Sequence, residues 1–192
     1  KLNQLDFAVL DESKKEQMLT AITNAKADGD SVGGVIECTV EGLAAGIGDH
    51  MFRGLENRIA QAVFGIPAVK GLEFGAGFEV AKMVGSQNND SFYVDDRGHV
   101  RTVSNNHGGI LGGITNGMPL VFRCAVKPTP SIYKEQNTID MRNGENTTLQ
   151  IQGRHDPAIV HRARVVVDSI TALTLIDLLC QKYGADKLIE KE

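Results

Sequence analysis

Glycine is the residue that most constrains how this chain can fold. The sequence holds 21 glycines among 192 residues, and many of them gather in two regions, 29–54 and 108–117. Because glycine has no Cβ atom, it adopts positive φ angles readily and lets another backbone or a ligand approach closely. We therefore expect tight turns, close ligand contacts or both in these two regions.

The composition places the chain among ordinary globular proteins. Hydrophobic residues make up 42% and charged residues 23%, which argues against disorder, collagen and coiled coil. No apolar run approaches the ~20 residues that a membrane helix needs, so we expect no membrane partner. The net charge is −4 and no basic stripe is visible, which argues against nucleic-acid binding. A local cluster of cations can still bind an anion. We treat residues 1–192 as one domain-sized portion.

The cysteines and the start of the chain bear on the cellular setting. Cys38, Cys124 and Cys180 are far apart, odd in number and without a CxxC pair, so we expect reduced thiols and no metal site. No secretory signal is visible, which favours a cytoplasmic protein. The chain opens Lys-Leu-Asn without a methionine. We expect either a processed product or the second half of a larger chain.

The apolar spacing of the first half predicts helices and strands in alternation. A capping box of Ser13 and Glu16 should open the first helix, and Asp49 should cap the second, with Phe52 on its buried stripe. The predicted elements are a helix at 13–27, a strand at 32–43, a helix at 51–64, a strand at 68–74 and a short helix at 76–83.

The second half is richer in strand and hairpin signals. Residues 92–94 and 99–103 form one predicted hairpin, and Asn116-Gly117 signals another, which leads into a strand at 119–126. A further strand is expected at 147–152. The longest helix is predicted at 157–183, with Pro157 at its first position and Leu173 on its inward face, and Gly184 should end it. Strands outnumber helices, so the pattern predicts an α+β fold with antiparallel sheets.

The densest polar segment runs from Ser104 to Gly117. Its glycines include two adjacent pairs, and Asn105, Asn106 and His107 add side-chain donors. The segment is neither a GxGxxG fingerprint nor a P-loop, because no Gly-Lys-Ser or Gly-Lys-Thr follows. A ligand-binding loop and a tight structural loop are both consistent with it.

Three other segments combine charge with a constrained backbone. Lys127-Pro-Thr-Pro-Ser131 offers an ammonium and two hydroxyls in a stiffened run, which suits a phosphate or simply the exit of an edge strand. Arg154, His155 and Asp156 stand at the entry of the long helix, where anions are favoured; Asp156 can carry chemistry or only cap the helix. The polar run 85–90 reads as a solvated turn.

Taken together, these segments resemble chorismate synthase. The matching pieces occur in the same order and spacing over essentially the whole chain: Asp28-Gly-Asp-Ser-Val-Gly-Gly34, Gly46-Ile-Gly-Asp49, Pro67-Ala-Val-Lys-Gly71, Gly77-Phe78, Gly85-Ser-Gln-Asn88, Ser104 to Gly113, Lys127-Pro-Thr-Pro-Ser131 and Gly153-Arg-His-Asp-Pro157. The resemblance covers only the C-terminal half to two-thirds of the family's length. The family's N-terminal segment, with its substrate-binding arginines and two histidines, has no counterpart here.

The resemblance implies a reaction, a fold and an assembly. Chorismate synthase, in the shikimate pathway to the aromatic amino acids, removes phosphate from 5-enolpyruvylshikimate 3-phosphate by 1,4-anti elimination. It needs reduced FMN (FMNH2), formed at the expense of NADPH, although the reaction has no net redox change. The implied fold is a sandwich of antiparallel sheets around a helical layer, incomplete in this chain. The implied assembly is a cytoplasmic homotetramer.

The resemblance also implies roles for individual residues. Pro67 and Ala68 would touch the flavin, Gly112 would line it, and Arg154 would contact it as well. Lys127, Pro128, Thr129, Pro130 and Ser131 would hold the region of the ribityl phosphate. Asp156 would sit near the flavin N5 and assist proton transfer.

Two further readings stay open. A half-length chain can be a non-catalytic FMN-binding or oligomer-forming piece of that enzyme. It can also be an unrelated α+β enzyme that binds phosphate. A second chain that supplies the missing half would favour the enzyme.

Overall fold

The structure is a computed structural model that describes residue 5 and residues 7–189. The chain divides into two compact units, each of which combines segments distant in sequence. Unit 1 comprises the described part of Lys1–Gly34 together with Val126–Ala163. Unit 2 comprises Val35–Ala125 and the described part of Arg164–Glu192. The helix α4, Val160–Tyr183, begins in unit 1 and continues in unit 2.

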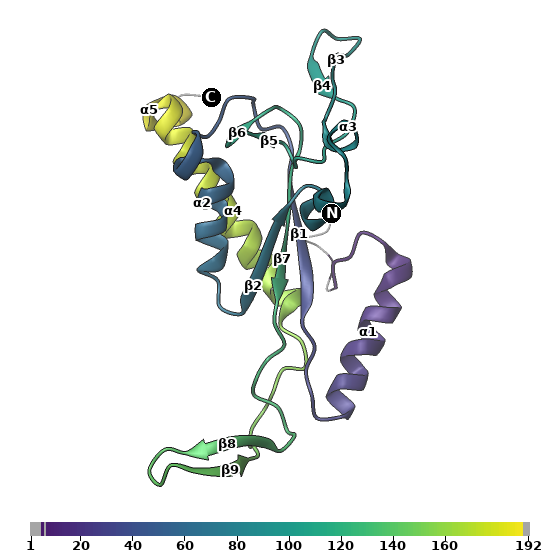
Figure 1. Cartoon of the computed structure of the whole chain (residues 1–192), viewed down its shortest axis with the longest axis vertical. Coiled ribbons are helices and arrows are strands. Elements are labelled where there is room, and N and C mark those ends of the chain that lie inside the picture. Colours follow the sequence, from purple (N-terminus) through teal and green to yellow (C-terminus); the bar gives the residue numbers. More distant parts are fainter. Residues whose placement is uncertain (1–4, 6, 190–192) are drawn as a thin grey trace. The chain divides into compact units, whose positions relative to one another are not determined.

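Helices and antiparallel strand pairs are mixed along the chain, so the predicted α+β class is confirmed (Figure 1). The helical segments are α1 Glu12–Ala27, η2 Met51–Arg53, α2 Leu55–Phe64, η3 Gly77–Lys82, α3 Gly85–Asn88, α4 Val160–Tyr183 and α5 Ala185–Ile189. The strands are β1 Gly34–Val40, β2 Val69–Phe74, β3 Phe92–Val94, β4 Val100–Thr102, β5 Ile110–Leu111, β6 Ile114–Thr115, β7 Leu120–Val126, β8 Gln136–Asp140 and β9 Glu145–Leu149.

The core of unit 2 is a three-stranded sheet with the order β1-β7-β2. Alternate residues of β7 are buried, among them Phe122 and Cys124, as expected of a strand with one covered face. The inward stripe of α2 packs into this core through Leu55, Ile59 and Val63. Arg58 of α2 forms an ion pair with Asp177 of α4, so the two helices are neighbours (Figure 1).

The second predicted helix begins later than the sequence indicated. Residues 51–53 form a separate 3-10 turn, and α2 begins only at Leu55. Gly54 has extended ψ, and the amide of Leu55 donates to the Gly113 carbonyl at 2.9 Å, which breaks a continuous helix. Phe52 therefore leaves the predicted buried stripe and is 85% exposed.

The long helix also starts later than predicted, at Val160 rather than at Pro157. The Pro157 carbonyl accepts a hydrogen bond from the amide of Val32 at 2.8 Å, so this stretch pairs with another segment instead of with its own helix. The predicted end is confirmed: Gly184 has a φ of +84° and its amide donates to the Cys180 carbonyl at 2.9 Å.

The helix α4 is apolar on two faces. Its inward face buries Val167, Leu175 and Leu178. Leu173, predicted to face inward, is 62% exposed, and Val165 and Ile176 are exposed beside it on the same side of the helix. Helices that are apolar all round are normally covered on both sides.

One helix cap and one hairpin turn differ from the prediction. Asp11, not Ser13, caps α1, because its side chain accepts from the amide of Ser13 at 2.9 Å. The second hairpin turns at the Gly112-Gly113 pair, between β5 and β6, and not at Asn116-Gly117. Asn116 instead closes the loop, because its amide donates to the Gly109 carbonyl at 3.0 Å.

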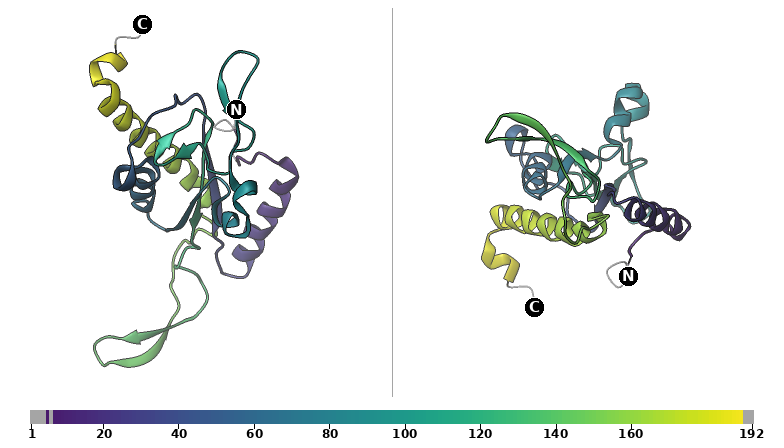
Figure 2. Two further views of the ribbon diagram at one scale, coloured as in Figure 1. Left: turned by 45° about the horizontal axis from the view of Figure 1, so that its top comes forward. Right: turned by 90° about the horizontal axis from the view of Figure 1, so that it is seen from below.

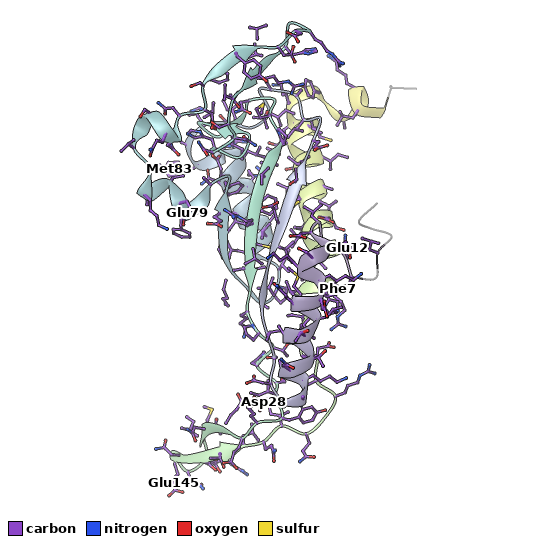
Figure 3. All side chains as sticks on the ribbon, turned by 90° about the vertical axis from the view of Figure 1, so that its right-hand side faces the viewer. Phe7, Glu12, Asp28, Glu79, Met83 and Glu145 are labelled. Carbon is purple, nitrogen blue, oxygen red and sulfur yellow. The ribbon has the colours of Figure 1, made fainter. Side chains whose placement is uncertain are left out.

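Unit 1 consists of α1, an irregular segment that links it to β1, and the β8–β9 ribbon. Figure 3 labels Glu12 and Asp28 at the two ends of α1. The strand β8, which the sequence did not reveal, forms a two-stranded sheet with β9 (Figure 2). Glu145 lies at the turn of this ribbon, opposite Asp140 (Figure 3).

The three cysteines are free thiols. Burial raises the pKa of Cys38 to about 11, although the Thr171 hydroxyl works against that shift. Cys124 is buried as well, whereas Cys180 is half-buried. The reduced state stays a prediction, and a pKa of about 11 keeps Cys38 protonated at neutral pH. Within the described residues, none of the helices is long and apolar enough to span a membrane.

Phe122 provides a test of the core of unit 2. Its side chain is fully buried and its ring lies 5.8 Å from that of Phe74. We expect Phe122→Ala to lower the free energy of unfolding by about 3–5 kcal/mol, because it leaves a cavity that the sheet cannot fill. Urea unfolding followed by circular dichroism measures this. The matched Phe52→Ala should change stability by less than about 0.5 kcal/mol; equal losses would contradict this assignment of the core.

Candidate functional site

In unit 1, the segment Lys127–Ser131 is held against the glycine-rich segment before β1. A Cβ atom at Gly33 would lie 2.4 Å from the Val126 carbonyl oxygen, so only glycine fits there. The Ser31 hydroxyl donates to the Thr129 carbonyl at 2.6 Å. Two segments about 100 positions apart in sequence are thus joined by a close backbone approach at Gly33 and a side-chain hydrogen bond from Ser31, which fix the path of the proline-containing run.

The same segment retains hydrogen-bonding capacity. Thr129 Oγ1 is buried and, within the part of the chain that the structure describes, has no hydrogen-bond partner. Lys127 is half-buried and Arg154 exposed, and neither forms an ion pair with a described acidic residue. A buried hydroxyl without a partner and two uncompensated cations suit an oxygen-rich anion.

A neighbouring lysine differs from Lys127 because it is neutralised inside the protein. Lys134 pairs with both Asp28 and Asp30, and its distance to the Asp30 carboxylate is 3.0 Å. The hydrogen bond from Lys134, followed by that from the Ser31 amide, lowers the pKa of Asp30. Lys134 thus anchors the start of the Asp28–Gly34 segment and is not available for a ligand.

The Arg154-His155-Asp156 run does not form one cluster. The carboxylate of Asp156 pairs with Arg162 in the first turn of α4, and no contact joins it to Arg154. Since α4 begins at Val160, Asp156 is not its cap. The His155 ring packs edge-on against Tyr133, with centroids 4.6 Å apart, and one ring nitrogen lies 3.2 Å from the Ile151 carbonyl oxygen. His155 is therefore a packing residue, whereas Asp156 is half-exposed.

In unit 2, the predicted contact residue Ala68 has a strained backbone. Its φ is +74°, and among the described non-glycine residues only Met51 shares a positive φ. Such conformations cost about 1–3 kcal/mol and cluster at ligand clamps and active sites. Pro67 is exposed and fixes the chain just before this point. The strain supports the prediction of a ligand contact at Ala68.

Gly112 lies at the tip of the β5–β6 hairpin. Its φ is +59°, and a Cβ atom placed there would meet nothing within 4 Å. Its backbone is thus both exposed and free to adopt the left-handed conformation that the turn requires. A flat ligand can approach it without a side chain in between.

A buried carboxylate organises the first part of the glycine loop. The side chain of Asp90 is only 1% exposed. One oxygen accepts from the Ser104 hydroxyl at 2.7 Å and from the Asn106 amide at 2.8 Å. The other accepts from the His107 amide at 3.0 Å and lies 2.7 Å from His107 Nδ1. The sequence analysis read Asp90 as part of a solvated turn, which is wrong.

The electrostatics of Asp90 follow from this geometry. Burial raises the pKa of the carboxyl group, but the hydrogen bonds from the His107 amide, Ser104 and Asn106 together outweigh it. The pKa falls to about 2 from an ordinary value of 3.8. The sequence signal for the buried Asp90 carboxylate was weak: an acid at the end of the polar run 85–90, with no cation close to it in sequence.

Unit 2 also has a pocket of about 360 Å³ that the predicted residues do not line. Its cations are partly neutralised: Arg58 pairs with Asp177, and Lys182 donates to the Gly46 carbonyl. The wall consists of Gly46, Gly48, Asp49, Arg53, Arg58, Leu178, Gln181 and Lys182. This pocket is therefore separate from the predicted site residues.

With this geometry in hand, comparison with known proteins identifies the family. Residues 1–180 match the family described as chorismate synthase. A solved structure titled "Crystal Structure of Chorismate Synthase" superposes with a TM-score of 0.72 at 37% identity, over 91% of this chain and 45% of that one. The chain belongs to the chorismate synthase family, and the resemblance drawn from the motifs is confirmed.

Individual relatives agree. A chorismate synthase of Dehalococcoides mccartyi is 50% identical over 99% of this chain and 52% of its own length. Those of Lachnoclostridium phytofermentans and Methanothermobacter thermautotrophicus are 55% and 49% identical, over 78% and 87% of this chain. The chain spans about half the length of the curated relatives that it matches.

The predicted site residues fall in both units. Unit 1 carries Lys127–Ser131, Arg154 and Asp156, and unit 2 carries Pro67, Ala68 and Gly112. Their roles toward a flavin remain predictions. The reasoning from sequence missed Asp90 and the anchoring contacts of Gly33 and Ser31, because these depend on which distant segments meet.

Asp90 also gives a prediction for acid stability. Its pKa is lower in the folded state, so its contribution is complete above about pH 4 and is lost as the pH falls toward 2. The shift corresponds to about 2 kcal/mol. We expect the difference in unfolding free energy between wild type and Asp90→Asn, measured by urea titration, to shrink by about that amount between pH 4 and pH 2. A difference that stays constant over this range would contradict it.

Proposed function

We propose that this chain supplies the flavin-binding part of a chorismate synthase. The reaction is the 1,4-anti elimination of phosphate from 5-enolpyruvylshikimate 3-phosphate, which gives chorismate and makes the protein a carbon–oxygen lyase of the shikimate pathway. The observation that carries the proposal is the family match over residues 1–180. The proposed setting is a cytoplasmic homotetramer in which residues 1–192 form a single C-terminal portion.

The residues present fit the cofactor, reduced FMN. The ribityl phosphate carries up to two negative charges. Lys127 would provide a cation for it, and the hydroxyls of Thr129 and Ser131 would provide two hydrogen-bond donors. The unpartnered Thr129 Oγ1 and the absence of a described acidic partner for Lys127 support this role. Arg154 adds a second cation without an acidic partner.

The flat ring of the flavin needs surfaces without projecting side chains. Gly112 offers open backbone at a hairpin tip, and Ala68 a small side chain on a backbone held at positive φ. Pro67 holds the approach to Ala68 rigid. When bound, reduced FMN, formed with NADPH as reductant, would supply the electron density that the departure of phosphate requires.

Asp156 is the proposed proton-handling residue. Its carboxylate is half-exposed and paired with Arg162, which holds it in place without burying it. A carboxylate that stays accessible can accept a proton or relay it. The groups that would bind the substrate phosphate belong to the part of the family that this chain does not match.

The second candidate is an FMN-binding or oligomer-forming piece without catalysis. The observation that favours it is the share of the relatives' length, about half, that the chain spans. An anaerobic titration of the purified chain with reduced FMN and 5-enolpyruvylshikimate 3-phosphate separates the candidates. Chorismate formation supports the enzyme, perturbed flavin absorbance alone supports the binding piece, and no change in either rejects both.

Lys127→Ala tests the phosphate contact. Loss of a charge-assisted hydrogen bond should weaken FMN binding by about 1.5–3 kcal/mol. Flavin fluorescence quenching gives the dissociation constant. Lys26→Ala is the control, because Lys26 is an exposed lysine at the end of α1 in the same unit. If both variants bind FMN as tightly as wild type, Lys127 is only a surface residue.

Asp156→Asn tests the proton-handling role in a full-length chorismate synthase that carries this segment. We expect unchanged circular dichroism and a single-turnover rate reduced by about 10²–10⁴-fold, the usual contribution of a general acid or base. Asp177→Asn is matched to it, since Asp177 is equally exposed and also pairs with an arginine. Equal rates in the two variants would remove Asp156 from the mechanism.

A further inference from the structure

The carboxylate of Asp90 has a role that the proposed function does not yet include. It lies between the α3 turn and strand β3, and its two oxygens receive four donors from residues 104–107. Consecutive backbone amides that converge on one anion form a concave anion site, here filled by a side chain of the protein itself. The charge makes each of these hydrogen bonds stronger than a neutral one.

The donors come from the start of the loop that carries Gly112. The neighbouring contacts of this loop are neutral: Asn106 donates to the carbonyls of Gln87 and Asn88 at 3.2 Å, and Asn105 spans the Pro119 carbonyl and the Gly109 amide. Asp90 is therefore the one charged group in this set of contacts. It fixes the loop immediately before the first glycine pair.

The same carboxylate orients an imidazole. His107 Nδ1 lies 2.7 Å from Asp90, whereas the side chain is 32% exposed and Nε2 has no protein partner among the described residues. A ring held through one nitrogen presents the other in a fixed direction. The amide and the ring of the same residue bind the same carboxylate oxygen.

We propose that Asp90 is a positioning residue that holds residues 104–107 and the His107 ring so that the loop presents the Gly112 backbone to the flavin. The proposal rests on the proposed function for the ligand. It assigns Asp90 no contact with that ligand. The rigidity comes from hydrogen bonds made before binding, which reduces the ordering cost when the ligand arrives.

Asp90→Asn is the decisive variant, because asparagine keeps the size but replaces one acceptor oxygen with an NH2 group that faces the His107 donors. Hydrogen exchange read by NMR should show the amides of Asn106 and His107 exchanging at least tenfold faster. The ¹⁵N spectrum should show changed ring-nitrogen shifts for His107, because Nδ1 no longer lies against a carboxylate. The dissociation constant for FMN should rise at least tenfold.

The chain contains a matched control in the adjacent hairpin. Asp95 also accepts from backbone amides, those of Arg97 and His99, and lies near the His99 ring. Its link to the glycine segment runs through Arg101, 3.6 Å from the carboxylate, which donates to the Gly117 carbonyl at 3.4 Å, away from residues 104–107. Asp95→Asn should leave the loop amides and the FMN affinity unchanged. His107→Gln should keep the loop amides protected, because the backbone donors to Asp90 remain. The loss of a ¹⁵N ring signal in this variant assigns that signal to His107.

The outcomes separate this proposal from the proposed function. Unchanged loop exchange and unchanged FMN affinity in Asp90→Asn would overturn the positioning role. A wild-type chain that binds no FMN would overturn the flavin assignment, while the exchange and ¹⁵N data still decide whether Asp90 anchors the loop. If Asp90→Asn does not fold, Ser104→Ala removes a single donor; faster exchange at Asn106 with intact circular dichroism then supports the role, and wild-type exchange contradicts it.

Discussion

The arrangement of unit 2 depends on one backbone joint, where the end of β2, the glycine loop and β7 meet at Gly75. The Gly75 amide donates to the Val121 carbonyl at 2.9 Å, and the Val121 amide donates to Gly108 at 3.0 Å. A Cβ atom on Gly75 would lie 2.1 Å from the Asn106 carbonyl oxygen. Three segments are therefore joined through main-chain atoms, and the Arg123 guanidinium also donates to the Gly75 carbonyl at 3.2 Å. The Asp90 anchor, the β5–β6 hairpin and Gly112 all follow from the position of this joint.

Unit 1 is also held together by a glycine that permits close backbone approach, here Gly33. Gly33 removes the side chain that would separate the strand start from the Val126 carbonyl, and Ser31 then bonds to Thr129. Because these contacts use the Thr129 carbonyl and no side chain of the Lys127–Ser131 run, the ammonium and hydroxyl groups of the run are left for other partners. Anchoring through main-chain atoms thus leaves the side chains free for function.

Local signals in the sequence were enough to predict some elements but not others. The signals for the strand at 119–126 and for the helix end at Gly184 act within a few residues, and both elements were confirmed. The start of α2 was missed because it depends on Gly113, about 60 residues away, which accepts from Leu55. The helix start at 157 was wrong for a similar reason, since Val32 claims the Pro157 carbonyl.

The candidate site shows the same division. Lys127, Arg154 and Gly112 were recognisable because residue type and motif register are properties of the sequence itself. Asp90 was not recognisable, because an acid in a polar run is usually solvated. The donors from Ser104, Asn106 and His107 meet at its carboxylate only in the folded chain. Anchoring residues are harder to predict than contact residues because their partners are distant in sequence.

The pairing of charges explains how an acidic chain can provide an anion site. The net charge is −4, but the field at one place depends on the charges that lie near it and on how they are paired. Lys134 is neutralised by Asp28 and Asp30, and Arg162 by Asp156, while Asp90 accepts from the Ser104 hydroxyl and from backbone amides. Lys127 and Arg154 have no such acidic partner among the described residues. The local field at unit 1 is therefore set by which cations remain uncompensated rather than by the sum over the chain.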